Sequence, residues 1–238
     1  MLVATVRALK AHSGRHRIVA GRPLPEALLA ENPDEVLEGA ANLRKQIENI
    51  RVHGVSPVVA INAFPQDHPS EHEAIRRVAE EAGARVAVSS HFSDGGRGAV
   101  ELARAVVEAA EEPSSFTFLY PDSASLKEKI EAVATKVYGA ANVTYSAAAD
   151  RQLATYEANG FGRLPVCIAK THLSISSDAS LKGAPTGWTM PVREVRASVG
   201  AGFVYPICGD MRTMPGLGAK PAAHIVELDA NGEIQGLS

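Results

Sequence analysis

Two phenylalanines stand where a parallel sheet would bind a flat ligand. Phe64 follows the apolar run VVAIN at residues 58–62, and Phe92 follows the next such run, VAVSS, at 86–90. Open α/β sheets bind their ligands at the carboxyl ends of strands, so two rings at neighbouring strand ends could clamp a flat heterocycle. The alternative is that each ring anchors its loop on the core, and the spacing alone leaves both interpretations open.

The residues around the two rings are suited to shaping strand ends. Asn62 and Pro65 flank the turn at Phe64. Gly95 and Gly96 come shortly after the second ring and permit close backbone approach, because glycine has no Cβ. They also precede a predicted helix, so this glycine cluster either holds an anion on the helix amides or forms a plain loop.

Several common catalytic motifs are absent from the sequence. The chain has no GxxxxGK[ST] phosphate loop and no GxSxG nucleophile elbow. His68 and His72 are four residues apart, but the sequence offers no third ligand nearby for zinc. We therefore assign no metal site and no catalytic residue.

Composition narrows the class of protein. The chain has 238 residues, of which 45% are apolar and 21% charged, and a formal net charge of −3. Without a basic stripe, nucleic acid is not an expected partner. No apolar run reaches the roughly 18 residues of a membrane span, so we expect a cytoplasmic protein with no membrane partner. Cys167 and Cys208 lie in apolar runs and are expected to be buried free thiols.

The elements that must position the two rings alternate between strand and helix. From apolar spacing and capping residues, buried strands are expected at 2–9, 56–62 and 84–90, and amphipathic helices at 33–54, 70–83 and 98–112. This alternation predicts parallel strands joined by crossover helices. Residues 1–112 are thus expected to form an α/β domain with a parallel three-layer sheet, incomplete, and P-loop-NTPase-like without the P-loop.

The pattern changes after Pro113. The expected elements are a short strand at 115–120, helices at 125–139 and 147–162, and β-rich segments at 192–210 and 222–237, with a hairpin turn at Asn231–Gly232. Residues 113–238 are therefore expected to form a smaller C-terminal α+β unit.

Seven segments occur in an order that is typical of one enzyme family. They are VATVRALK (3–10), NLRKQIENI (42–50), VVAINAFPQD (58–67), GGRGAVELA (95–103), KEKIEAVATKVYGA (127–140), GFGRLPVCIAKT (160–171) and TMPGLGAKPAA (213–223). Together they resemble the C-terminal portion of formate–tetrahydrofolate ligase, also called formyltetrahydrofolate synthetase. The resemblance covers nearly all of the chain.

The resemblance implies a folate site at the two rings. In that family, ATP and formate give formyl phosphate, which N10 of tetrahydrofolate attacks. The resemblance implies that Phe64 is one side of a clamp around the pterin, and that Phe92, where the family typically has Trp, is the other. The predicted folate-binding residues are Phe64, Phe92, Pro65, Asn62, Gly95 and Gly96.

Some residues depart from the family pattern or have an open role. Ser90 and Asp94 stand in SSHFSDGG where relatives read like SEVWAKGG, which alters the charge beside the pterin. Lys170 and Arg193 are either partners for the glutamate tail of folate or ordinary surface charges. Two loops have no assigned role, at residues 11–33 and 213–217.

The resemblance does not extend to the family's N-terminal part, which carries the phosphate loop, and it implies that this chain alone does not activate formate. We weigh three hypotheses. The chain acts with an N-terminal ligase half supplied as a separate polypeptide, and ATP with magnesium binds only in that completed enzyme. Alternatively, it is a non-catalytic folate-binding or regulatory module. Third, it is a remnant that forms a homo-oligomer through an open strand edge at residues 2–9.

Overall fold

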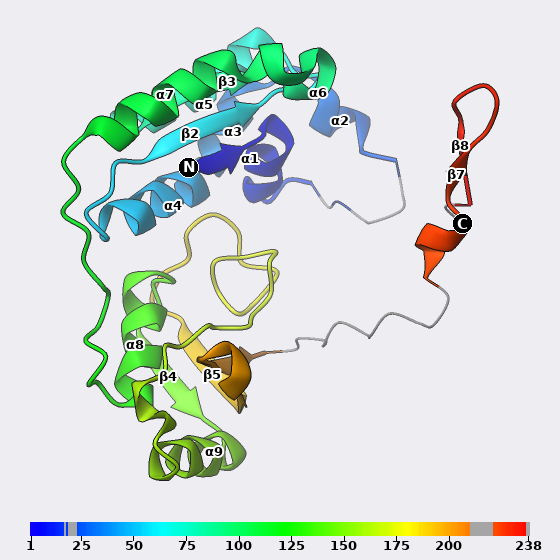
Figure 1. Cartoon of the computed structure of the whole chain (residues 1–238). Coiled ribbons are helices and arrows are strands. Elements are labelled where there is room, and N and C mark those ends of the chain that lie inside the picture. The colour runs from blue at the N-terminus through cyan, green and yellow to red at the C-terminus, as the bar shows by residue number, and fades with distance from the viewer. Residues whose placement is uncertain (17, 19–22, 210–220, 237–238) are drawn as a thin grey trace.

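The computed structural model describes residues 1–16, 18, 23–209 and 221–236. Its first group of elements consists of β1 (Leu2–Ala4), α1 (Val6–His12), α2 (Glu26–Leu29), α3 (Pro33–Gly39), α4 (Ala41–Arg51), β2 (Val58–Asn62), α5 (Pro69–Glu81), β3 (Arg85–Ser89), α6 (His91–Asp94), a 3₁₀ turn η1 (Gly95–Ala99) and α7 (Val100–Glu111). These elements are coloured blue to green in Figure 1.

The first sheet is parallel, with strand order β1-β2-β3. Val59 and Ile61 of β2 pack into a hydrophobic core with residues of α1, α3, α4 and α5. Val58 and Ala60 alternate with them and are also buried, on the face that α7 covers (Figure 1). The predicted α/β class is confirmed, whereas the likeness of its layers to those of P-loop NTPases stays a prediction.

The prediction of a buried strand over residues 2–9 is wrong beyond Ala4. Thr5 caps a helix instead, because its Oγ1 accepts a hydrogen bond from the backbone N–H of Ala8 at 3.1 Å. β1 is also less buried than expected, since the side chain of Val3 is 62% exposed. Among the described residues, β1 pairs with β2 alone and so forms one edge of the sheet.

The helix predicted over 33–54 is divided in two at Ala40, where α3 ends and α4 begins. α3 is capped by Asn32, whose Oδ1 accepts from the backbone N–H of Glu35 at 3.1 Å. The break lets α3 pack closely on α1, and Gly39 lies at that contact. The spacing of apolar residues did not reveal the break, because the apolar residues of both helices pack into one core.

The second group of elements begins after the predicted boundary at residue 113. It consists of α8 (Leu126–Lys136), β4 (Asn142–Tyr145), α9 (Ala147–Ala158), η2 (Phe161–Arg163), β5 (Thr189–Ser198), η3 (Val199–Ala201), β6 (Phe203–Cys208), η4 (Ala222–His224), β7 (Glu227–Leu228) and β8 (Ile234–Gln235). β4 runs parallel to β5, and β5 antiparallel to β6. β7 and β8 form the hairpin expected around Asn231–Gly232.

The strand predicted at 115–120 is not formed. Ser115 and Thr117 donate backbone hydrogen bonds to the carbonyls of Gly54 and His53, at 3.3 and 3.0 Å. The segment thus lies along the turn after α4 and joins none of the three sheets of the described residues. Sequence reasoning also missed β4, a four-residue strand between two helices.

Two separate clusters of buried hydrophobic residues lie on either side of residue 113. The first includes residues from Ala4 to Ala84, and the second from Leu126 to Cys208. Hydrogen bonds join the two parts, for example from Asn42 Nδ2 to the carbonyl of Gly183 at 3.2 Å. The division into domains 1–112 and 113–238 stays a prediction that this packing favours.

Both cysteines are free, but only Cys208 is buried as expected. Cys167 is exposed, because its segment runs along β6 with Val166 and Ile168 facing the core and the residue between them facing outward.

None of the helices within the described ranges is long and apolar enough to cross a bilayer.

Candidate functional site

The structure brings the two predicted aromatic residues together. Phe64 follows β2, and Phe92 lies in the four-residue helix α6 that follows β3. Their ring centroids are 5.5 Å apart, with an interplanar angle of 52°. Because β2 and β3 are neighbouring parallel strands, the two rings meet at one carboxyl edge of the sheet, where open α/β sheets bind ligands.

The two rings contact one another and leave no space between them for a third ring. A flat ligand between parallel rings needs about 7 Å from wall to wall, since each contact takes about 3.5 Å. Phe92 is the ring that can move, because its side chain is 66% exposed, whereas Phe64 is partly buried. A clamp at this position therefore opens through Phe92.

A tight turn fixes the backbone of Phe64. The backbone N–H of Asp67 donates to the carbonyl of Phe64 at 3.0 Å, and Asp67 Oδ2 accepts from the backbone N–H of Phe64 at 2.9 Å. Pro65 occupies the second position of this turn, where its restricted φ is favourable. His72 Nε2 lies 3.3 Å from Asp67 Oδ2 and holds the carboxylate from the side of α5.

Asn62 ends β2, two residues before Phe64. It pairs in register with Ser89 of β3, and its Oδ1 is buried without a hydrogen-bond partner. Such an atom is available to a ligand donor that reaches this edge.

The loop after Phe92 is held by polar contacts. Ser90 Oγ donates to Asp94 Oδ2 at 2.5 Å, so the two positions that depart from the family pattern bind each other. Gly95 and Gly96 have open space where a Cβ would stand, and close packing occurs instead at Gly98, next to Ser90. The role of Gly95 and Gly96 in approaching a ligand stays a prediction.

Sequence reasoning missed Arg7, the third residue at this edge. Its guanidinium carbon lies 4.8 Å from the centroid of the Phe64 ring, and its Nη2 donates to Gln66 Oε1 at 2.9 Å. The strand predicted through residue 9 hid it. With β1 ending at Ala4, Arg7 follows the end of its strand as Phe64 follows β2, and that spacing is the signal that could have identified it.

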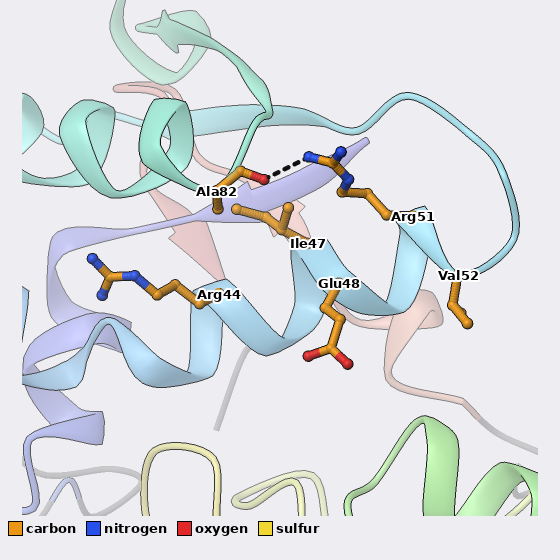
Figure 2. A pocket seen from close by; sticks show the side chains of 6 residues that line it. All are labelled: Arg44, Ile47, Glu48, Arg51, Val52 and Ala82. Atoms are coloured by element: carbon orange, nitrogen blue, oxygen red, sulfur yellow. Dashed lines mark hydrogen bonds between the residues drawn. The ribbon is translucent and has the colours of Figure 1, made fainter.

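A groove of about 480 Å³ lies elsewhere, between α4 and the end of α5 (Figure 2). Its arginines are already engaged: Arg44 pairs with Glu81 at 2.9 Å, and Arg51 Nη1 donates to the carbonyl of Ala82 at 2.9 Å. The groove is next to the amino ends of β2 and β3. We therefore do not assign the ligand site there.

The two residues considered for the glutamate tail of folate lie in the second group of elements. Lys170 is not available for it: its Nζ donates to the carbonyls of Thr171, Ser174 and Ser176, at 3.1, 2.5 and 3.2 Å, which uses all three donors of the ammonium. Burial lowers the pKa of Lys170 to about 8. Arg193 is exposed on β5, away from the sheet that carries the rings.

The 213–217 loop lies outside the described residues. Across residues 1–16, 18, 23–209 and 221–236, no group of three or more His, Cys, Asp and Glu side chains converges as a metal site would require.

Comparison with known proteins identifies a family for this chain. A family model described as formate–tetrahydrofolate ligase matches residues 1–238. Curated proteins named formate–tetrahydrofolate ligase match the whole chain, with 74% identity over 238 residues in Saccharopolyspora erythraea and 60% over 237 residues in Cutibacterium acnes. Formate–tetrahydrofolate ligase 3 of Rubrobacter xylanophilus is 64% identical over 246 residues. The chain spans 42%, 42% and 43% of the length of these relatives, respectively.

Proposed function

This chain belongs to the formate–tetrahydrofolate ligase family, and we propose that it supplies the folate-binding side of an ATP-dependent ligase that makes 10-formyltetrahydrofolate. The observation that carries the proposal is the contact of Phe64 with Phe92 at adjacent strand ends. In the proposed complex the pterin lies between the two rings, with Asn62, Pro65, Gly95 and Gly96 around it.

The proposed division of labour follows from what the chain contains. In the reaction that the family resemblance implies, N10 of tetrahydrofolate attacks the carbonyl carbon of formyl phosphate, and phosphate leaves. Such a transfer depends on positioning and on stabilising the negative charge that develops. We propose that this chain positions the pterin, and that the part of the ligase outside this sequence binds ATP with magnesium and generates formyl phosphate. The chain alone is then inactive.

The sheet offers a place for that other part of the ligase. Within the described residues β1 pairs only with β2, and the side chains of Met1 and Val3 are 66% and 62% exposed. A strand added beside β1 would cover these side chains and satisfy the free edge. A second copy of this chain is the alternative occupant.

Replacing Phe64 with Ala is expected to weaken tetrahydrofolate binding by about 5- to 150-fold, since stacking of a base on one aromatic ring is worth about 1–3 kcal/mol. The measurement is anaerobic calorimetric titration of the purified chain with tetrahydrofolate. Phe118→Ala is the matched control, because Phe118 is 78% exposed and lies outside the site. Equal affinity of the two variants would contradict the proposed site.

Mixing this chain with the part of the Saccharopolyspora erythraea ligase that it does not match is expected to give phosphate release that depends on ATP, formate and tetrahydrofolate together. Neither polypeptide alone is expected to be active, and Phe64→Ala is expected to reduce the rate in the mixture. Folate binding without activity in the mixture would instead favour a non-catalytic folate-binding module. That second candidate suits Phe92 and Asp94, which stand where the resemblance places Trp and Lys.

A further inference from the structure

Arg7, Phe64 and Phe92 come from three successive strand ends and lie in a row along one edge of the sheet. Arg7 is the second residue of α1, which follows β1, and its guanidinium lies over the ring of Phe64 at 4.8 Å. The ring of Phe64 in turn contacts that of Phe92 at 5.5 Å. An aromatic ring has two faces, and the guanidinium of Arg7 lies over one of them, so a heterocycle can stack on Phe64 only on the other face.

Arg7 is held both by the ring of Phe64 and by a hydrogen bond to the turn that carries this ring. Its Nη2 donates to Gln66, which belongs to the same turn as Phe64, but its Nε is buried and has no acceptor. A buried donor without a partner costs free energy. Stacking of the guanidinium on Phe64 offsets this cost. This arrangement is expected if Arg7 serves to hold the ring in place.

The two walls of the clamp therefore differ in mobility. Phe64 is restrained by Arg7 on one face and by the turn to Asp67 along its backbone. Phe92 is two-thirds exposed and belongs to a four-residue helix that is followed by Gly95 at φ 58°. A pterin that enters between them displaces Phe92 and meets a ring that is already in place.

We propose that Arg7 is a positioning residue that backs Phe64 and fixes it as the rigid wall of the pterin clamp, with Phe92 as the movable wall. The inference rests on the proposed folate site and names a residue that acts through Phe64 without touching the pterin. Pre-ordering one wall reduces the conformational entropy that binding must remove, so it raises affinity.

A double-mutant cycle tests the role of Arg7. In the otherwise unchanged chain, Arg7→Met is expected to raise the Kd for tetrahydrofolate about tenfold, from the loss of a stacked cation. The same change is expected to have less than about a twofold effect in a Phe64→Leu background, where no ring remains to be backed, and its full effect in a Phe92→Leu background. Leucine keeps apolar contact at either position so that binding stays measurable.

The matched control is Arg104→Met, since Arg104 lies on the exposed surface of α7, where it pairs with Glu101. Arg7→Lys retains the positive charge but not the planar guanidinium that stacks on the ring. Its Kd for tetrahydrofolate is expected to lie between those of wild type and Arg7→Met. If Arg7→Met weakens binding equally in all three backgrounds, its role is generally structural and the inference is overturned. An unchanged Kd in the Arg7→Met variant would also overturn the inference. If the unmutated chain binds no tetrahydrofolate, the proposed folate site itself fails.

Discussion

Replacing Glu71 with Leu is expected to lower the free energy of unfolding by about 3–5 kcal/mol, the usual cost of removing one partner of a buried ion pair. Glu71 pairs with Lys10, and the two side chains are only 1% and 0% exposed. After the change, the ammonium of Lys10 keeps two carbonyl acceptors, Leu28 at 3.2 Å and Ala30 at 2.6 Å, but no negative charge. Urea unfolding at pH 7 measures the loss.

The Glu71 carboxylate also connects segments that position the candidate site. It accepts hydrogen bonds from the backbone N–H of Asn32 at 3.0 Å and of His68 at 3.2 Å. His68 follows the turn that holds Phe64, and Lys10 belongs to the helix that carries Arg7. Glu71→Leu is therefore expected to weaken tetrahydrofolate binding as well as the fold.

Two comparisons separate the buried pair from an ordinary surface charge. Glu81→Leu removes the exposed partner of Arg44 and is expected to cost less than about 1 kcal/mol. In the double variant Lys10→Met/Glu71→Leu no charge remains unpaired, so the total loss is expected to be smaller than the sum of the two single losses. If Glu71→Leu lowers the free energy of unfolding no more than Glu81→Leu does, the buried pair of Lys10 and Glu71 does not stabilise the fold as argued.

The pH dependence gives an independent check. Burial opposes the ionised form of Glu71, but hydrogen bonds from Lys10 and from two backbone amides outweigh it and lower its pKa below 4.5. A depressed carboxyl pKa stabilises the fold above the unfolded-state pKa, and this contribution is lost as the pH falls through the folded-state value. The stability difference between wild type and Glu71→Leu should therefore narrow below about pH 4.5.

The strands that precede the two aromatic rings were predictable from sequence because their signals are local. VVAIN and RVAVS are apolar runs long enough to read as buried strands, and Gly83 ends the helix between them at φ 74°. Once those strands are parallel neighbours, the meeting of Phe64 with Phe92 follows from where each strand ends.

The features that sequence reasoning missed depend on contacts between distant segments. Thr5 is compatible with a strand or with a helix cap, and the packing of α1 against α3 decides between them. From the sequence alone, Lys10 would be interpreted as a surface charge. The fold brings Glu71, 61 positions later, beside it in the core. Lys170 reads the same way until its loop folds three carbonyls around it. Spacing along the chain contains none of this information.

Gly39→Ala is expected to destabilise the chain by about 3 kcal/mol, at the upper end of the cost of overpacking. Gly39 is the last residue of α3, where it meets α1. A Cβ at this position would lie 1.7 Å from the carbonyl oxygen of Leu9 and 2.6 Å from its carbonyl carbon. Both are backbone atoms, so α1 and α3 must move apart, and α1 carries Arg7 and Lys10 with it.

The sign of this effect distinguishes packing from helix propensity. Alanine is favoured over glycine within a helix by about 0.5–1 kcal/mol, so propensity alone predicts that Gly39→Ala stabilises the chain. The clash with Leu9 is several times larger and should dominate. Gly200→Ala is the control, because no atom lies within 4 Å of the added Cβ, and its effect is expected to stay within about 0.5 kcal/mol. Urea unfolding of both variants measures these effects. A Gly39→Ala chain as stable as wild type would show that α1 and α3 are not held in close contact. The positions of Arg7 and Lys10 argued from that contact would then be wrong.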